Sequence, residues 1–179
     1  MKTKRILIWI GIVVISVAAS YSWAVLWHNN YCNGASVFFL RNRLSDILDT
    51  LWAAINEEVL WRVIPLLSIS SILLWTKYDS NKTKKIIFCI VAFLIVLVVQ
   101  IQFGYAHYNK VFETEDWLFK HIVLQGTMGL FYAISYNVVQ HLARKKVGLP
   151  LLYSHLFGLL TSFIVHAVTN SLIIIKFTF

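Results

Sequence analysis

The sequence predicts an all-α protein, a polytopic integral membrane helical bundle with about five transmembrane helices. Three observations predict this fold class. First, 59% of the 179 residues are hydrophobic and 13% are charged, whereas a soluble domain has about 45–50% apolar and about 25% charged residues. Second, the apolar residues form long runs separated by short polar segments. Third, backbone groups inside lipid must be satisfied internally, which favours helices for such runs.

The first predicted helix runs from Ile6 to Trp27 and follows a basic start, Met1 to Arg5. The apolar core of a signal peptide is usually shorter, about 7–15 residues. We therefore expect a retained helix, and a cleaved signal peptide is the alternative. Residues 1–43 are predicted to form this N-terminal transmembrane helix and an external loop, and residues 44–179 the functional core.

The core is predicted to hold four further helices. They run from Ser45 to Trp75, from Ile86 to His107, from Leu118 to Ala143 and from Leu149 to Ile175. At about 1.5 Å per residue, the first of these would extend roughly 45 Å, more than the roughly 30 Å of a hydrocarbon core. We therefore expect its first turns to lie in the membrane interface, or a kink near Pro65.

The net charge of the chain is +8, and the basic residues gather in short segments between the apolar runs. This distribution indicates membrane topology, with the lipid bilayer as partner, and not a nucleic-acid footprint. The segments predicted to share one side of the membrane contain Lys2, Lys4, Arg5, Lys77, Lys82, Lys84, Lys85, Arg144, Lys145 and Lys146. The positive-inside rule then predicts a cytoplasmic N-terminus and an external C-terminus, in a bacterial-type plasma membrane.

Two adjacent carboxylates lie inside the second predicted helix, in the segment from Asn56 to Arg62. Ionisable residues within a membrane segment are costly and are candidates for function. Glu58 and Arg62 are spaced i,i+4, so they share a helix face and can pair. Glu57 points about 100° away, and a carboxylate without that partner suits a general base that activates water. The structural alternative is an ion pair beside one interfacial glutamate.

Two further polar positions fall within predicted helices. His107 ends the third helix in the segment Phe103-Gly-Tyr-Ala-His107, and its alternative interpretation is an interfacial side chain. His166 and Asn170 are spaced i,i+4 on the fifth helix, so both can converge on one point and stabilise an oxyanion. An ordinary hydrogen bond between membrane helices is the alternative for this pair.

Several other residues have predicted structural roles. Gly104, Gly126 and Gly129 are predicted to permit close helix contact. His121 is interpreted as interfacial and His155 as lining the bundle interior.

The three spacings, in this order, resemble the CAAX-protease and bacteriocin-processing family of intramembrane proteases. That family carries EExxxR, FxxxH and HxxxN on successive membrane helices, and the resemblance covers about Leu44 to Ile175. It implies an intramembrane endopeptidase that hydrolyses a peptide bond of a membrane-associated or exported peptide or protein. The implied roles are water activation by Glu57, water positioning by His107, oxyanion stabilisation by His166 and Asn170, and shaping of the site by Glu58 and Arg62.

Zinc is a possible cofactor, because family members are also labelled metalloproteases. Glu57, His107 and His166 could supply three ligands and leave a fourth position for water. The sequence lacks HExxH, so a separate base would then be needed. We favour the glutamate-activated water and assign no cofactor.

Other interpretations stay open at this level. One is a non-catalytic membrane scaffold or binding protein. Another is a proton or ion pathway built on Glu57, His107, His155 and His166. The short chain and the predicted external position of the site favour an exported or membrane-anchored peptide over a prenylated substrate, and the sequence predicts no oligomeric state.

Overall fold

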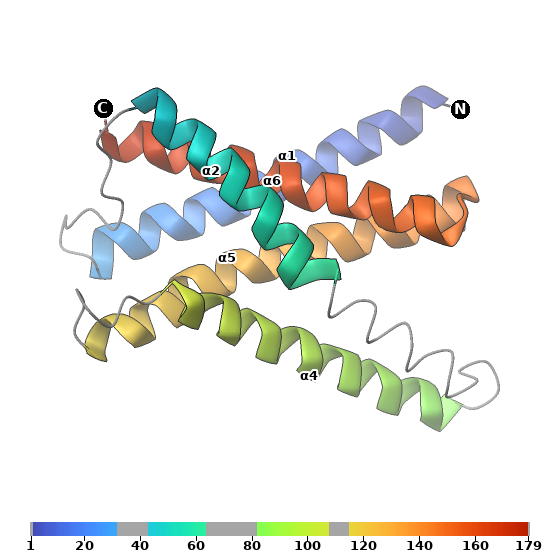
Figure 1. Ribbon diagram of the computed structural model, residues 1–179. Helices are drawn as coiled ribbons and strands as arrows, with labels where there is room; N and C mark the ends of the chain where they lie inside the picture. The colour runs from blue at the N-terminus through green and yellow to red at the C-terminus, as the bar shows by residue number, and fades with distance from the viewer. Residues whose placement is uncertain (1, 32–42, 64–81, 108–114, 179) are drawn as a thin grey trace. The chain divides into compact units, whose positions relative to one another are not determined.

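The described part of the chain is helical almost throughout. The structure is a computed structural model that describes residues 2–31, 43–63, 82–107 and 115–178 (Figure 1). Its helices are α1 (Lys2–Tyr31), α2 (Arg43–Glu58), the π-helix η1 (Val59–Val63), α4 (Lys82–Ala106), α5 (Glu115–Leu142), the π-helix η2 (Ala143–Val147) and α6 (Leu151–Thr178). The predicted all-α class is therefore confirmed for these residues.

Three of the described helices are long and apolar enough to cross a membrane. They contain the segments Arg5–Trp27, Leu118–Val147 and Leu151–Lys176, which coincide with the first, fourth and fifth predicted spans. Helix α4 carries the apolar run of the third predicted span, and its crossing of the membrane stays a prediction. The predicted second span runs from Ser45 to Trp75, and its part after residue 63 lies outside the described residues. The predicted kink near Pro65 therefore also lies outside them. Membrane insertion through several helices fits the structure, and the number five stays a prediction.

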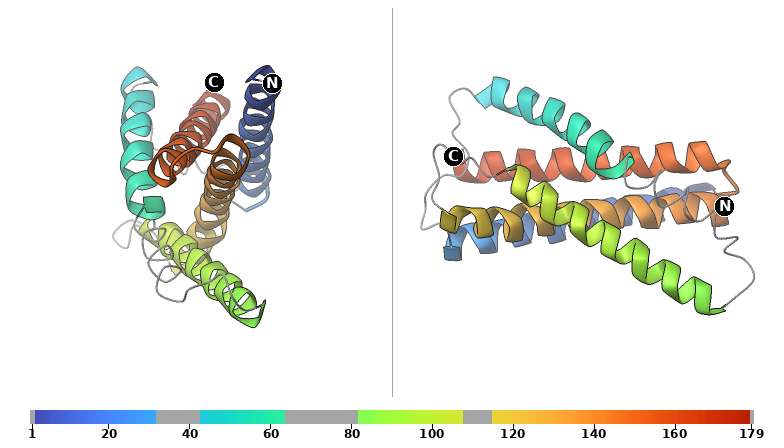
Figure 2. Two further views of the ribbon diagram at one scale, coloured as in Figure 1. Left: turned by 90° about the vertical axis from the view of Figure 1, so that its right-hand side faces the viewer. Right: turned by 60° about the horizontal axis from the view of Figure 1, so that its bottom comes forward.

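The contacts divide the chain into two compact units. The first unit contains Met1–Glu58 and Phe131–Phe179, and the second contains Val59–Leu130. In the first unit α6 packs against both α1 and α2, and Figure 2 shows these neighbours from two further directions. The predicted division into an N-terminal helix with its loop (residues 1–43) and a functional core (residues 44–179) stays a prediction.

Helices α1 and α6 of the first unit run in the same direction (Figure 1). The indole Nε1 of Trp9 donates a hydrogen bond of 2.8 Å to Thr161 Oγ1. The Trp9 ring also lies 5.7 Å, centroid to centroid, from the Phe157 ring. These contacts join the starts of the two helices. The other faces of α1 expose large apolar side chains such as Leu7 and Ile15, as expected for contact with lipid.

The turn between α5 and α6 is tightly closed. Gly148 has a left-handed φ of 78°, and its N–H donates to the carbonyl of Ala143, an arrangement that glycine adopts without a steric cost. One step into the hairpin, Gln140 Nε2 donates to Ser154 Oγ at 3.3 Å. Tyr136 Oη lies 2.6 Å from His155 Nδ1. His155 therefore contacts the facing helix, as predicted for a side chain that lines the bundle.

In the second unit, α4 and α5 approach closely at two glycines. A Cβ on Gly104 would lie 2.5 Å from Ile122 Cα, and a Cβ on Gly126 would lie 2.8 Å from the carbonyl oxygen of Gln100. The predicted packing role of both glycines is confirmed. The interfacial interpretation of His121 is wrong, because its side chain is only 4% exposed. The cause is this close approach, since His121 precedes Ile122 on the packed face of α5.

Candidate functional site

Glu57 and Glu58, at the C-terminal end of α2, have opposite environments. Glu58 lies one turn after Ala54 on the face of α2 that is buried, and both residues are at most 1% exposed. The Glu57 side chain keeps 27% of its surface exposed, because consecutive helical residues point about 100° apart. One carboxylate is thus enclosed by protein, and its neighbour is accessible.

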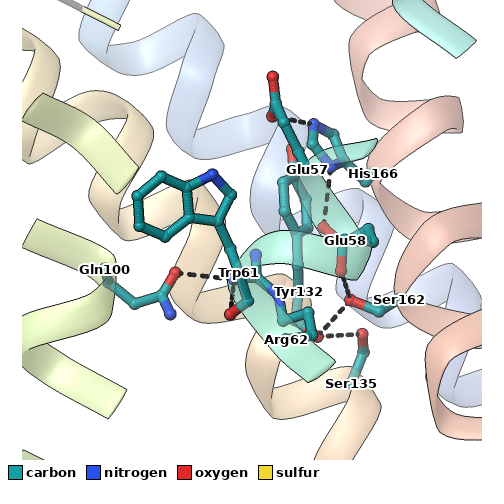
Figure 3. Close-up of polar contacts among 9 residues, drawn as sticks. All are labelled: Glu57, Glu58, Trp61, Arg62, Gln100, Tyr132, Ser135, Ser162 and His166. Carbon is teal, nitrogen blue, oxygen red and sulfur yellow. Dashed lines mark hydrogen bonds and ion pairs between the residues drawn. The ribbon is translucent and has the colours of Figure 1, made fainter. Parts of the chain in front are cut away.

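Two side chains of α6 are hydrogen-bonded to Glu58 (Figure 3). Ser162 Oγ donates to Glu58 Oε2, and His166 Nδ1 lies 2.9 Å from Glu58 Oε1. Ser162 and His166 are one helical turn apart, so they present their polar groups to the same carboxylate. Such bonds offset the cost of burying a charged group.

His166 lies between the two glutamates and is 3% exposed. The ring nitrogen that faces Glu58 is Nδ1, at 2.9 Å from Glu58 Oε1. The opposite ring nitrogen, Nε2, lies 3.5 Å from Glu57 Oε2. That distance is longer than a normal hydrogen bond of about 2.7–3.2 Å. Glu58 therefore holds the imidazole more tightly than Glu57 does.

Tyr132 of α5 forms the wall behind the imidazole. Its ring is stacked on His166, with centroids 4.3 Å apart and planes 19° from parallel. Its carbonyl accepts a 2.7 Å hydrogen bond from Ser135 Oγ and lies 3.0 Å from Ser162 Oγ. Three helices of the first unit, α2, α5 and α6, thus hold the orientation of His166.

Asn170 lies one turn after His166 on α6 and is partly exposed. The predicted common helix of these two residues is confirmed. The hydrogen bonds next to His166 include those with Glu58, Ser162 and the backbone of Tyr132. The role of Asn170 as an oxyanion donor stays a prediction.

Arg62 belongs to the second unit and lies in the π-helix η1. Its side chain is 2% exposed. Its Nη1 donates to the Gln100 side-chain oxygen and to the Trp61 carbonyl, both at 3.2 Å, and its guanidinium carbon lies 5.6 Å from the centre of the Phe103 ring. Short π-helical segments are frequent at functional sites. The predicted pair between Glu58 and Arg62 stays a prediction.

His107 follows the last residue of α4, in the second unit. Its Nδ1 lies 2.7 Å from the carbonyl oxygen of Phe103, and the two rings meet edge to face with centroids 4.7 Å apart. A carbonyl oxygen only accepts, so Nδ1 carries the proton and the neutral ring has its lone pair on Nε2. The spacing Phe103-xxx-His107 thus brings the carbonyl and the ring of Phe103 against the His107 imidazole and orients it.

The described residues give no support to a metal centre. Among them, no group of three or more His, Cys, Asp or Glu side chains is placed to hold a metal ion. The predicted ligand set of Glu57, His107 and His166 draws on both units and stays a prediction. We route no chemical step through a metal.

Ser162, Tyr132 and Gln100 were not anticipated from the sequence. Ser162 precedes His166 by four residues, and this spacing was the one signal that could have indicated it. Tyr132 and Gln100 gave no such signal, since their roles depend on contacts made between helices. An aromatic residue in an apolar helix is otherwise typical of core packing.

The chain was compared with protein families, curated proteins and solved structures. No family model, no curated protein and no solved structure matches the chain. The likeness to the CAAX-protease and bacteriocin-processing family rests on the three motif spacings, and we treat it as a proposal.

Proposed function

We propose that this chain is an intramembrane endopeptidase in which Glu57 activates the hydrolytic water. The observation that carries the proposal is the contrast between the two adjacent glutamates. Glu58 is 1% exposed and bonded to His166 and Ser162, while Glu57 is 27% exposed beside His166 Nε2. Adjacent carboxylates in such different environments are typical of sites where one residue supports and the other performs chemistry.

In this mechanism Glu57 removes a proton from water as the water oxygen bonds to the scissile carbonyl carbon. The bond between that carbon and the amide nitrogen then breaks, and the leaving amine must gain a proton. Glu57 now carries the proton taken from water, and His166 Nε2, 3.5 Å from Glu57 Oε2, accepts that proton and passes it to the leaving nitrogen, which returns both residues to their starting states. General acid–base steps of this kind contribute about 10²- to 10⁴-fold to a rate.

This assignment changes the role implied by the family resemblance for His166. In our mechanism Glu58 is ionised and accepts a hydrogen bond from His166 Nδ1, so the neutral ring has a lone pair at Nε2 and cannot donate to an oxyanion from there. We therefore assign proton transfer to His166. Asn170 keeps the oxyanion role, since an amide N–H donates in every protonation state of the site.

For the remaining residues the family resemblance implies water positioning by His107 and shaping of the site by Arg62, and both roles stay predictions. The substrate is an exported or membrane-anchored peptide or protein, cleaved in a bacterial-type plasma membrane with the N-terminus of the enzyme in the cytoplasm. The three helices that are long and apolar enough to span a membrane support the membrane location.

The proposal is tested by comparing newly formed peptide termini in membranes of cells that express the wild type or Glu57→Gln. We expect termini that appear with the wild type and are missing with Glu57→Gln, which keeps the side-chain size and removes the base. Asp49→Asn is the matched control, because Asp49 is an exposed acid on the same helix, two turns earlier. Identical termini for wild type and Glu57→Gln would remove the protease assignment.

A non-catalytic scaffold is the second candidate function. It is favoured by the burial of the His166–Glu58 pair, whose side chains are 3% and 1% exposed. A polar core of this kind can specify how helices pack, without any chemistry. The scaffold predicts that Glu57→Gln has no effect on function and that Glu58→Gln lowers stability.

A further inference from the structure

One end of the first unit gathers positive charge from two distant parts of the sequence. Since α1 and α6 run in the same direction and meet through the Trp9–Thr161 bond, the start of α1 lies at the same end as the α5–α6 turn. The left view of Figure 2 faces this end. The Lys and Arg residues that the backbone brings there are Lys2, Lys4, Arg5, Arg144, Lys145 and Lys146.

The acidic residues of the first unit lie elsewhere. Within its described residues they are Asp46, Asp49, Glu57 and Glu58, all on α2. The last turn of α2 meets α6 at Ser162 and His166, and the rest of α2 extends toward the C-terminal end of α6 (Figure 1). The end with the basic turn therefore has no acidic side chain among the described residues of this unit to neutralise it.

We expect the basic turn at the depth of lipid headgroups. Its three cations occupy the last turn of the candidate span that ends at Val147, and three residues separate it from the candidate span that begins at Leu151. Arg144, Lys145 and Lys146 are all exposed. Leu152 and Tyr153, just inside the turn, are also exposed, at 67% and 60%. Exposed apolar side chains next to exposed cations fit the boundary between acyl chains and headgroups.

The turn is also closed by hydrogen bonds within the chain. Gly148 and Leu149 both donate backbone hydrogen bonds to the Ala143 carbonyl. The Gln140–Ser154 bond lies directly below. A binding surface that is already ordered loses less conformational entropy on binding. The three consecutive cations are therefore presented on a fixed scaffold.

We propose that this basic end, Arg5 with Arg144, Lys145 and Lys146, binds the phosphate of anionic phospholipid headgroups. Clusters of four to eight basic residues at a membrane surface attract anionic lipids, and each contributes about a fivefold gain in affinity near the surface. None of these four residues has a role in the proposed hydrolysis by Glu57 and His166. The lipid-binding proposal therefore stands or falls independently of the proposed function.

The test measures thermal unfolding of the purified full chain in neutral detergent, with added phosphatidylglycerol or with phosphatidylcholine of the same acyl chains. A ligand that binds the folded state raises the unfolding midpoint with its concentration. We expect phosphatidylglycerol to raise the midpoint and phosphatidylcholine to leave it unchanged. Arg144→Gln with Lys145→Gln and Lys146→Gln should weaken the apparent affinity on the order of 100-fold, since three charges are removed.

Two controls distinguish a local lipid site from other causes. Lys82→Gln with Lys84→Gln removes two exposed charges from the second unit and should weaken binding less than Lys145→Gln with Lys146→Gln. Equal losses from the two pairs would overturn the proposal. Inorganic phosphate at millimolar concentration is expected to give no shift, and a shift as large as that from phosphatidylglycerol would show a free-phosphate site instead. Equal shifts from both lipids would also contradict the proposal.

Discussion

His166 Nδ1 lies 2.9 Å from Glu58 Oε1, although the two residues are 108 positions apart in the sequence. This bond joins the end of α2 to the middle of α6 and fixes which ring nitrogen faces Glu58. Because Nδ1 is committed to Glu58, Nε2 is the nitrogen that lies toward Glu57. The buried glutamate thus orients the imidazole, and the accessible glutamate can act with it.

Ser162 is expected to support the site through Glu58. Replacing it with Ala removes the donor to Glu58 Oε2, and a buried acceptor left without its partner costs about 1–3 kcal/mol. We expect Ser162→Ala to lower kcat roughly tenfold with little change in KM, and Ser162→Thr, which keeps the hydroxyl, to restore most of kcat. The assay follows cleavage of a peptide identified from the new termini.

Ser171→Ala is the matched control for this variant. Ser171 is on the same helix and donates to the Ala167 carbonyl of its own turn, so its loss should leave kcat unchanged. Equal kcat for Ser162→Ala and the wild type would show that Glu58 does not need this bond.

Tyr132 is expected to hold His166 by ring stacking. Tyr132→Phe keeps the ring at 4.3 Å from the imidazole and should retain most activity. Tyr132→Leu removes the stacked ring from a fully buried position and should lower stability by about 2–4 kcal/mol, together with kcat. Detergent-based unfolding and the cleavage assay measure the two effects. If Leu and Phe behaved alike, stacking would have no part in orienting His166.

Gly104 is expected to be required for the contact of α4 with α5. A Cβ at this position would lie 2.5 Å from Ile122 Cα and 2.8 Å from the His121 carbonyl oxygen, so the backbones would have to move apart. Gly104→Ala should lower the free energy of unfolding by about 1–3 kcal/mol.

Gly11→Ala provides the opposite expectation in the same assay. A Cβ at Gly11 would meet nothing within 4 Å, and alanine is favoured over glycine inside a helix by about 1 kcal/mol. Unfolding titrations should therefore show Gly11→Ala equal to or more stable than the wild type. Equal destabilisation by the two substitutions would contradict the close packing of α4 and α5.

The glutamate mechanism and the zinc alternative differ in their response to chelators. We expect cleavage to persist after dialysis against a strong zinc chelator, because Glu57 and His166 act without a metal in our proposal. A zinc enzyme would lose activity and recover it on addition of Zn²⁺. Such loss and recovery would restore Glu57, His107 and His166 as candidate ligands.

The apolar runs of the sequence predict most of the described helical segments. Runs such as Ile6–Trp27 are apolar enough that α1 follows from composition alone. The start of α4 at Lys82 was not predicted, because the charged residues before Ile86 were assigned to a linker. The π-helix at Val59–Val63 was also not predicted. A segment of five residues is too short for its side-chain periodicity to differ visibly from that of an α-helix.

The candidate site was predicted in part. Local spacing identified Glu57, Glu58 and His166, and these three side chains do come together. Spacing did not predict that Glu58 serves His166, because that bond joins helices that are 108 positions apart. The same reason explains Tyr132, whose contact with His166 depends on how α5 and α6 pack. Sequence periodicity gives the face of one helix and not its register against another.

The most direct test of the account is a double-mutant cycle on Glu57 and His166. The purified full chain, Glu57→Gln, His166→Gln and the double variant are assayed for kcat/KM on one peptide that the wild type cleaves. Residues that act as a unit in the chemical step give strongly non-additive losses. We predict that each single variant loses at least about 100-fold and that the double variant is no slower than the slower single variant. Wild-type kcat/KM in Glu57→Gln, or losses that multiply in the double variant, would contradict the proposed pairing of Glu57 with His166.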